Sequence, residues 1–579
     1  MTAYFEDFEH VQPPELTLMS TARSTAWQLV ASMALGFGAW YLWWRWSAGL
    51  NDAAPLFSVA TASAETLAYA GLALFIFDIW KEPSRPLSPA PVGAGHGPDD
   101  EVVVDIVIAS LDEPPEILRP TIRDALSVRV PPGFRAMIHL ADDGCRPEAA
   151  ALATEYGIGY FDRPDNLGYK AGNLRHVLFR TNGAFLVICD ADTRLFPGFL
   201  ENTLGYFNDS RVGWVQTPHW FYEVPEGVTL ASLLRSMSQK CAQLLPLGVL
   251  RRLEKVKVGG DPFFASSLLF FDVIQRRRDR NHASFCCGAG SVHRRDALFA
   301  SALARRSRLQ TLVDGDPGLA RGRATPQVEP FRFHVSEDIC TSRIQHGLGW
   351  RSVYHPRVEA KMLSPRSYRA WTLQSFKYAG GSFDLFFNEP GVAQNGMPLA
   401  TRLHYLATFW SYLSALWSPI LIAAPIIALM TGVAPVGNYA SSFFAHLLPF
   451  LVSAEIALAI GSKSHAHDAG RRLALSGLVT NLRGLWVAWR RLPIRFVATP
   501  KIPTKGDDLR LALPGLLIVA AGFSAIAVGV WSASVGRDGY DASFLTVNTA
   551  WIVWNSWGLL SVAVGTLTTG FLARHAPAR

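Results

Sequence analysis

The chain has 579 residues, of which 49% are hydrophobic and 12% are aromatic, and its mean hydropathy is positive. This length and apolar content exclude a soluble protein of one domain and indicate a membrane protein with a large soluble part. The net charge of +7 collects in loops that we expect inside the cell, so it does not require a nucleic-acid partner.

Six apolar runs are long enough to cross a bilayer, which takes about 20 residues. They lie at 26–46, 56–80, 403–430, 439–462, 512–532 and 545–572. The first run follows a polar segment at 1–24, lacks a small-residue cleavage site and ends in a tryptophan cluster at 43–46. We therefore expect a first membrane helix there rather than a cleaved signal peptide.

Basic residues predict the orientation, because Lys and Arg near the ends of spans collect on the cytoplasmic side. The loops at 47–55, 431–438 and 533–544 carry one basic residue, Arg537, whereas the segment 463–511 carries ten. This predicts a cytosolic location for 463–511, for both termini and for the region 81–402. All six cysteines lie in that region without CxxC spacing, which favours free thiols in a reducing compartment.

The soluble region begins after a linker rich in Pro and Gly at 81–100. Strand patterns follow at 102–110, 136–144 and 184–192, and helical patterns lie between them. This alternation predicts a mostly parallel sheet covered on both faces, hence an α/β domain at 101–365 that is inserted in a bundle of about six membrane helices. Around this domain we expect a cytosolic segment at 1–24, two spans at 25–80, interface helices at 366–402, two spans at 403–462, an amphipathic interface segment at 463–511, and two spans with a short tail at 512–579.

Acidic clusters end two of the predicted strands, where ligands of parallel sheets bind. For Asp142-Asp143-Gly144, ordinary turn chemistry is an equal alternative. In Asp190-Ala191-Asp192, two carboxylates lie on one side of an extended chain, and a divalent cation would relieve their repulsion. Lys170 and Asn173, in the stretch NLGYKAGN, would add positive charge and donors for a diphosphate.

A third acidic position, Asp338, precedes a helical pattern. Together with Ser336 it either caps that helix or, as a carboxylate separate from the metal pair, takes a proton from an attacking hydroxyl.

In this order the motifs resemble those of the cellulose synthase branch of the processive, inverting family 2 glycosyltransferases, from about Asp105 to Lys501. The resemblance implies a GT-A-type domain that binds a UDP-sugar on Mg²⁺, or on Mn²⁺, held by Asp190 and Asp192, with Asp338 as the general base. The stretches that carry it are Asp142-Asp143-Gly144, YKAGN at 169–173, Asp190-Ala191-Asp192, VQTPHWFY at 215–222, FCCGAGSVHRR at 285–295, Ser336-Glu337-Asp338, QSFKY at 374–378 and FVATPK at 496–501.

The resemblance also implies roles for single residues. Donor contacts fall to Asp142, Asp143, Lys170, Asn173, Asp190, Gln374 and Lys377; acceptor contacts fall to Tyr378, Cys287, His219 and Glu337; and Phe496, Thr499 and Lys501 form a gating loop. Lys377 and Tyr378 replace the Arg and Trp of the family's QxxRW pattern. An alternative is that these two residues only anchor an interfacial helix.

This resemblance implies that the protein polymerises a UDP-sugar, with UDP-glucose as the expected donor, into a β-glucan and secretes it through its own channel in the bacterial inner membrane. The linkage is β-1,4 or, because of Lys377 and Tyr378, β-1,3 or mixed. Expected partners are the growing polysaccharide, membrane lipids and a periplasmic export protein. Alternatives are a hyaluronan-type or chitin-type synthase, a non-processive lipid glycosyltransferase, and a transporter with a regulatory domain.

Further expectations concern the membrane part and its surroundings. Glu65 and Glu455 are costly within apolar runs and should face the bundle interior or a water-filled path. Only RHAPAR follows the last run, so we expect no cyclic-di-GMP-binding module in this chain. The residues of the basic insertion at 300–335 do not indicate a role for it. Channel-lining candidates, which could equally be interfacial anchors, are Trp410, Tyr412, Trp417, Trp551, Trp554, Asn555 and Trp557.

Overall fold

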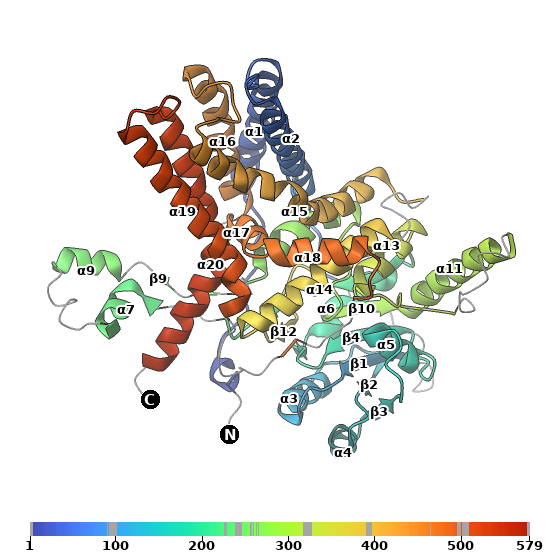
Figure 1. Ribbon diagram of the computed structural model, residues 1–579. Coiled ribbons are helices and arrows are strands. Elements are labelled where there is room, and N and C mark those ends of the chain that lie inside the picture. The colour runs from blue at the N-terminus through green and yellow to red at the C-terminus, as the bar shows by residue number, and fades with distance from the viewer. Residues whose placement is uncertain are drawn as a thin grey trace.

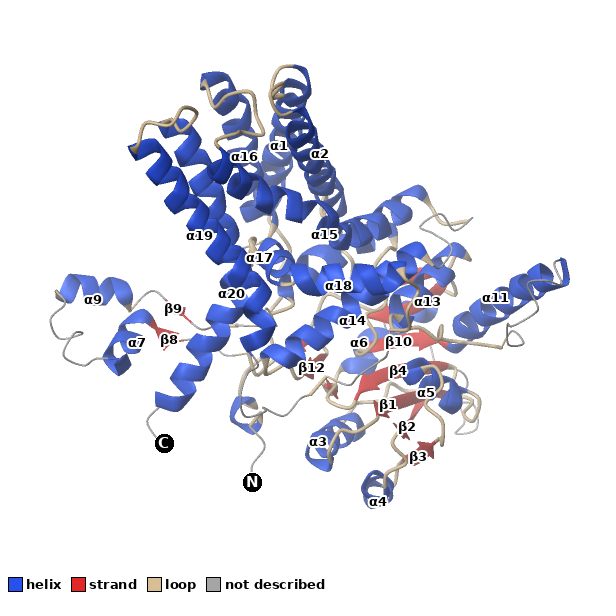
Figure 2. Cartoon of the chain, viewed as in Figure 1, coloured by secondary structure: helices blue, strands red, loops and turns tan. Residues whose placement is uncertain are grey.

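A computed structural model shows an α/β unit beside a bundle of long helices (Figures 1 and 2). It describes residues 4–575 except for those at 90, 92–100, 225–227, 238–245, 255–256, 259, 262, 264–265, 316–326, 389–395, 464, 495–498 and 501–508. The predicted gating-loop residues Phe496 and Lys501 lie outside the described residues, as does the centre of the basic insertion.

The α/β unit is built on a seven-stranded sheet with the order β11-β6-β10-β4-β1-β2-β3. Strand β10 is antiparallel to both neighbours, and the other pairs are parallel. The three predicted strands are β1, β2 and β4, so the predicted α/β fold is confirmed. The strands are β1 Val102–Ser110, β2 Phe134–Asp142, β3 Gly159–Asp162, β4 Phe185–Asp190, β6 Val212–Gln216, β10 Ser291–Arg294 and β11 Arg351–Tyr354.

Helices cover both faces of this sheet, because alternate residues of each central strand point to opposite faces. Ile106 and Ile108 pack in one core with Leu118 of a helix on that face. Val107 packs in the other core with Leu174. The helices of the unit are α3 Pro115–Leu126, α4 Pro147–Tyr156, α5 Tyr169–Leu178, α6 Phe199–Thr203, α11 Arg295–Gly315 and α13 Glu337–Gly347.

A small three-stranded sheet, β5-β12-β7, lies next to the large one and carries the N-terminal segment. Phe5 packs against Trp220, and Glu9 binds Arg194 and Lys361. The short elements of this region are η1 Glu6–Phe8, β5 Arg194–Leu195, β7 Trp220–Phe221 and β12 Ala360–Met362. A separate two-stranded sheet, β8 Val228–Thr229 and β9 Lys257–Val258, lies with α7 Leu230–Met237 and α9 Leu247–Leu253 (Figure 1). The chain continues into the π-helix η4 Leu269–Gln275 and α10 Arg276–Arg278.

Five of the described helices are long and apolar enough to cross a membrane, which identifies a multi-pass membrane protein. They are α2 Pro55–Asp78, α15 Leu399–Thr431, α16 Ser441–Gly461, α19 Leu513–Ser534 and α20 Ala542–His575. The remaining predicted span, the first one at 26–46, forms helix α1, Thr21–Ser47, which packs along α16. It is not one of the five by composition, because its tryptophans, Gln28 and Arg45 make it less apolar. The number of spans therefore stays a prediction.

Three helices lie between the bundle and the α/β unit: α14 Tyr368–Phe387, α17 Ala469–Ser476 and α18 Leu478–Trp489 (Figure 1). Helix α14 approaches its neighbours closely at two glycines. A Cβ atom at Gly381 would lie 2.1 Å from Ser336 Oγ, and one at Gly484 of α18 would lie 3.0 Å from the backbone nitrogen of Gly380. These glycines allow α14 to pack between the start of α13 and α18.

The acidic residues predicted inside the apolar runs both have basic partners. Glu65 accepts hydrogen bonds from Arg45, which is fully buried, and from Tyr41, so it faces the interior of the bundle as predicted. Glu455 binds Arg471 at the end of α16.

Candidate active site

The predicted acidic clusters lie at one edge of the large sheet. In the strand register, Ser110 at the end of β1 pairs with Asp142 of β2, and Ala109 pairs with Asp190 of β4. The two aspartates therefore flank the carboxyl end of β1, where ligands bind in sheets of this kind.

Arginines that the sequence analysis did not identify hold the first acidic cluster. Asp142 is fully buried. Its carboxylate accepts two hydrogen bonds from Arg146, one from the backbone nitrogen at 2.7 Å and one from the side-chain Nη2 at 2.8 Å. Arg163 donates to both carboxylate oxygens of Asp143, at 2.5 and 3.0 Å. Burial raises the pKa of Asp143, while Arg163 opposes the rise. Both carboxylates are thus braced by guanidinium groups within the fold.

Lys170, on the first turn of α5, donates a hydrogen bond to Asp190 across the strand ends. Burial disfavours its charge, but the carboxylates of Asp190 and Glu337 outweigh that effect and raise the pKa of Lys170. The Asp190 side chain is 47% exposed. Asp192 is buried, and its Oδ2 accepts from the backbone nitrogen of Leu363 at 3.0 Å. One aspartate of the pair is therefore open to a ligand, and the other is fixed by the small sheet.

Asp338 lies on the first turn of α13, and its Oδ1 accepts from the backbone nitrogen of Ile339 at 2.8 Å. Gly288, with φ of +86°, lies between it and Lys170: a Cβ atom there would be 3.5 Å from Lys170 Nζ and 3.9 Å from Asp338 Oδ2. A side chain at Gly288 would therefore enter the space between the two charges. Residues from three separate sequence motifs converge at this point.

The two carboxyl groups at the start of α13 repel each other in a partly buried setting. Burial raises the pKa of Glu337, and the charge of Asp338 raises it further. Burial also raises the pKa of Asp338, while Lys170 opposes the rise. Ser336 makes no side-chain capping hydrogen bond, so its part of the capping alternative is wrong, whereas Asp338 does accept from a backbone nitrogen of the first turn. These shifts are typical of sites for acid–base chemistry.

The stretches VQTPHWFY and FCCGAG, predicted to line an acceptor path, are hydrogen-bonded to each other. His219 Nε2 donates to the carbonyl of Ala289 at 2.7 Å, and the backbone nitrogen of Cys287 donates to Gln216 Oε1 at 2.7 Å. Burial lowers the pKa of His219 to about 4, which keeps the ring neutral. Burial also raises the pKa of Cys287, which keeps its thiol protonated. Gln216, which was not predicted, is fully buried and holds the two segments together.

Tyr378 is on α14, and 55% of the residue is exposed. Desolvation by the surrounding protein raises the pKa of its hydroxyl, and the charge of Asp338 raises it further. The accessible ring of Tyr378 therefore lies within the electrostatic reach of Asp338. The adjacent Lys377 donates from Nζ to Thr499 Oγ1 at 3.0 Å. The helix that carries Tyr378 is thus joined to the part of the predicted gating loop that the structure describes, residues 499–500.

Two further residues, Asn173 and Gln374, were predicted to contact the donor sugar nucleotide. Asn173 is buried, and its Nδ2 donates to the carbonyl of Ala141 at 2.8 Å, which holds α5 against β2. Gln374 is half-buried on α14, one turn before Lys377 and Tyr378. Contacts of either residue with a donor sugar nucleotide stay predictions.

A metal ion at this site would need ligands beyond the protein. Among the residues that the structure describes, no group of three or more His, Cys, Asp or Glu side chains could hold one. Asp190 and Asp192 offer carboxylate oxygens, which Mg²⁺ and Mn²⁺ prefer, and Mg²⁺ sites often take their remaining ligands from phosphate and water. The two residues therefore fit a divalent cation that is shared with a phosphate-bearing ligand.

Comparison with known proteins agrees with this geometry. Residues 105–299 match glycosyl transferase family 2. The chain is 25% identical to a cellulose synthase 1 of Komagataeibacter xylinus over 85% of its own length and 28% of the relative, and 24% identical to the UDP-forming cellulose synthase catalytic subunit of Pseudomonas fluorescens over 93% of its own length and 64% of the relative. It therefore spans less than two thirds of these relatives. Among solved structures, a mannosyltransferase of Pyrobaculum calidifontis in complex with GDP-Man and Mn²⁺ matches 74% of this chain and 99% of its own at 14% identity, with a TM-score of 0.43.

Proposed function

Since residues 105–299 form a family 2 glycosyltransferase domain of GT-A type in a chain related to bacterial cellulose synthase catalytic subunits, we propose that the protein is a processive membrane glycosyltransferase that makes a β-glucan from UDP-glucose. The observation that carries the proposal is the convergence of Lys170, Asp190 and Asp338 around Gly288, with the exposed ring of Tyr378 within the electrostatic reach of Asp338.

The donor binds with its diphosphate at the end of β4. Asp190 and Asp192 would hold Mg²⁺, with Mn²⁺ as the alternative, and the bound cation would supply positive charge for the diphosphate of UDP. Lys170 exchanges its bond with Asp190 for a phosphate oxygen, where an ammonium group is a good partner. Asp142 and Asp143, braced by their arginines, border the nucleotide side of the site.

Asp338 is the general base. It takes the proton from an acceptor hydroxyl that attacks the anomeric carbon on the face opposite UDP, so the linkage inverts to β. A base of this kind contributes about 10²–10⁴-fold to the rate. The raised pKa of Asp338 suits this role, because a carboxylate of ordinary pKa is a weaker base.

The acceptor sugar rests on Tyr378, whose flat ring matches the C–H face of a pyranose. His219, Cys287 and Glu337 line the path to it. The product leaves through the helix bundle, and Thr499 belongs to a gating loop with Phe496 and Lys501. The bundle lies in the bacterial inner membrane with the catalytic domain in the cytosol, and membrane lipids and a periplasmic export protein are the further partners.

The test uses the purified full chain in detergent with radiolabelled UDP-glucose and either Mg²⁺ or Mn²⁺. We expect UDP release that chelation of the cation abolishes, and a polymer that linkage-specific glucanases digest. Activity with UDP-N-acetylglucosamine alone would favour a hyaluronan-type or chitin-type synthase. Addition of a single sugar to a lipid would favour a non-processive enzyme, and no UDP release with either donor would contradict the proposal and favour a transporter.

A further inference from the structure

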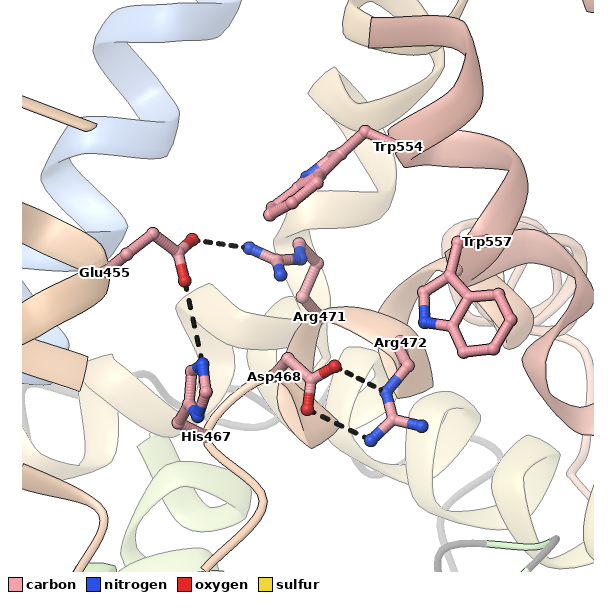
Figure 3. Close-up of a pocket in the computed structure, with 8 residues that line it drawn as sticks. Glu455, His467, Asp468, Arg471, Arg472, Trp554 and Trp557 are labelled. Carbon is pink, nitrogen blue, oxygen red and sulfur yellow. Dashed lines mark hydrogen bonds and ion pairs between the residues drawn. The ribbon is translucent and has the colours of Figure 1, made fainter. Parts of the chain in front are cut away.

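A small hollow opens among helices α16, α17 and α20, away from the glycosyltransferase site (Figure 3). Its volume of about 230 Å³ is below the ~300 Å³ of pockets for drug-sized ligands, so it suits a small polar group. The lining residues are Glu455 of α16, His467 and Asp468 of the loop, Arg471 and Arg472 of α17, and Trp554, Trp557 and Gly558 of α20.

The hollow lies near the end of the bundle that faces the α/β unit. Glu455 comes six residues before the end of α16, which is about 9 Å along a helix. Ser476 of α17 donates from Oγ to the carbonyl of Gly558 at 2.7 Å, so α17 meets α20 at this level. The hydrocarbon core of a bilayer is about 30 Å thick, close to the length of α16. The hollow is therefore at the depth where hydrocarbon gives way to headgroups.

Apolar side chains continue from the hollow along the outer faces of the helices. Val452 and Ile456 of α16 are 56% and 45% exposed, and Val553 of α20 is 51% exposed. In a soluble setting such a surface would be costly, whereas in a membrane it contacts acyl chains. The charged hollow thus lies at the end of an apolar surface.

The charges in the hollow are balanced and accessible. Arg471 binds Glu455 at 2.7 Å and lies over the ring of Trp554, 4.0 Å from its centroid. Arg472 binds Asp468 at 2.9 Å. Both guanidinium groups and both carboxylates are between 24% and 38% exposed, so a ligand can reach them. Figure 3 shows the two ion pairs side by side, with Trp554 over Arg471 and Trp557 beside Arg472.

We propose that this hollow binds the headgroup of a phospholipid that carries both a phosphodiester and a primary ammonium group. The guanidinium groups of Arg471 and Arg472 are suited to phosphate oxygens, and the carboxylates of Glu455 and Asp468 accept from the ammonium group. Trp557 and Trp554 lie at the glycerol level, as tryptophans at membrane interfaces do. Because the two guanidinium groups and two carboxylates cancel, a zwitterionic headgroup fits better than an anionic one.

The bound lipid would hold α17 against both α16 and α20. Helix α17 leads directly into α18, which packs against α14, the helix that carries Lys377 and Tyr378. The binding itself does not depend on the proposed glycosyl transfer.

The experiment mixes the purified full chain with vesicles of equal parts dioleoyl-phosphatidylethanolamine, phosphatidylcholine and phosphatidylglycerol, and counts retained lipids by native mass spectrometry. We expect retention of phosphatidylethanolamine over the other two lipids by about tenfold, and a loss of about tenfold in the Arg471→Gln/Arg472→Gln variant. Arg537→Gln is the matched control, since Arg537 also lies over a tryptophan, Trp531, but at the other end of the bundle.

A second variant keeps the test decisive if the double variant folds poorly. Asp468→Asn should keep phospholipid binding but lose the discrimination against phosphatidylcholine, whose ammonium group has no N–H. Soluble glycerophosphoethanolamine should compete only at much higher concentration, because it lacks acyl chains. Preference for phosphatidylglycerol, equal retention by wild type and the double variant, or equal competition by the soluble headgroup would overturn the proposal.

Discussion

Lys377 on α14 donates a hydrogen bond to Thr499, which follows α18 in the chain, with a donor–acceptor distance of 3.0 Å. In the proposed enzyme this bond couples the donor-binding helix to the gating loop. We expect Lys377→Met and Thr499→Val each to lower the rate of UDP release, with a double variant that is no worse than Lys377→Met. A double-mutant cycle should return a coupling of about 0.5–3 kcal/mol.

Thr372→Val is the matched control for that cycle, because the Thr372 hydroxyl donates only within its own helix, to the carbonyl of Tyr368 at 2.9 Å. It should leave UDP release unchanged. Strict additivity of Lys377→Met and Thr499→Val would show that the contact has no part in turnover.

The carboxyl pair at the start of α13 predicts opposite results for two isosteric variants. Burial raises the pKa of both groups, and the charge of Asp338 raises the pKa of Glu337 further, to about 8. In the proposed mechanism Asp338 is the group that must be ionised, and Glu337 is the partner that can keep a proton. Asp338→Asn should therefore lower turnover by about 10²–10⁴-fold, whereas Glu337→Gln, a mimic of the protonated form, should stay within about threefold of wild type.

The pH profile gives an independent check on this pair. Because the pKa of Asp338 is raised, the base is lost as the pH falls through a value above about 3.9, the ordinary pKa of aspartate. The acid limb of turnover should lie above that value. An acid limb at or below pH 4, or full activity of Asp338→Asn, would remove Asp338 from the role of base.

Motifs within one segment were predictable from the sequence, and partners far apart along the chain were not. The strands β1 and β4 were predictable because they are largely buried and give nearly continuous apolar runs. Arg163 was missed as the partner of Asp143, since no local pattern links residues 20 positions apart. Gly288 was inside a predicted stretch, but only the fold shows that Lys170 and Asp338 flank it.

The N-terminal segment illustrates the same limit. Its sequence indicated only a polar cytosolic piece before the first helix. In the structure, Phe5 packs against Trp220, and Glu9 pairs with Arg194 and Lys361 of the small sheet. These contacts join residues as much as 352 positions apart, and single side chains that dock on a distant sheet leave no periodic pattern.

Glu9 should affect cation binding through that sheet. Arg194 comes two residues after Asp192, and Lys361 comes two residues before Leu363, which donates to Asp192 at 3.0 Å. Glu9→Gln weakens both ion pairs and should lower the free energy of unfolding by about 1–3 kcal/mol. The Mg²⁺ concentration for half-maximal UDP release should rise about threefold or more.

Asp7 is an exposed residue of the same segment, so Asp7→Asn is the control for Glu9→Gln. It should change neither the free energy of unfolding nor the Mg²⁺ concentration for half-maximal UDP release. If Glu9→Gln lowers the unfolding temperature but leaves the Mg²⁺ dependence unchanged, the N-terminal segment supports folding without positioning Asp192.

Gly381 should tolerate no side chain. A Cβ atom there would lie 2.1 Å from Ser336 Oγ, so Gly381→Ala must push α14 away from the start of α13. We expect a loss of about 1–3 kcal/mol in the free energy of unfolding and a fall in turnover of up to about 10²-fold, because Tyr378 and Asp338 move apart. Gly36→Ala in α1, where a Cβ would meet nothing within 4 Å, should be silent in thermal unfolding and in UDP release.

Tyr378 offers the most direct test of product linkage. In the proposed acceptor site the ring of Tyr378 supports the terminal sugar, and it is smaller than the tryptophan of the related pattern, so the sugar can sit at a different tilt. A different tilt presents a different hydroxyl to Asp338, which predicts β-1,3 or mixed linkages. We expect Tyr378→Trp to shift the product towards β-1,4 linkage, measured by methylation and glucanase digestion of polymer from purified enzyme. Tyr378→Phe, which keeps the ring size, should leave the linkage unchanged. A wild-type product that is wholly β-1,4 and the same in Tyr378→Trp would show that this ring does not select the hydroxyl.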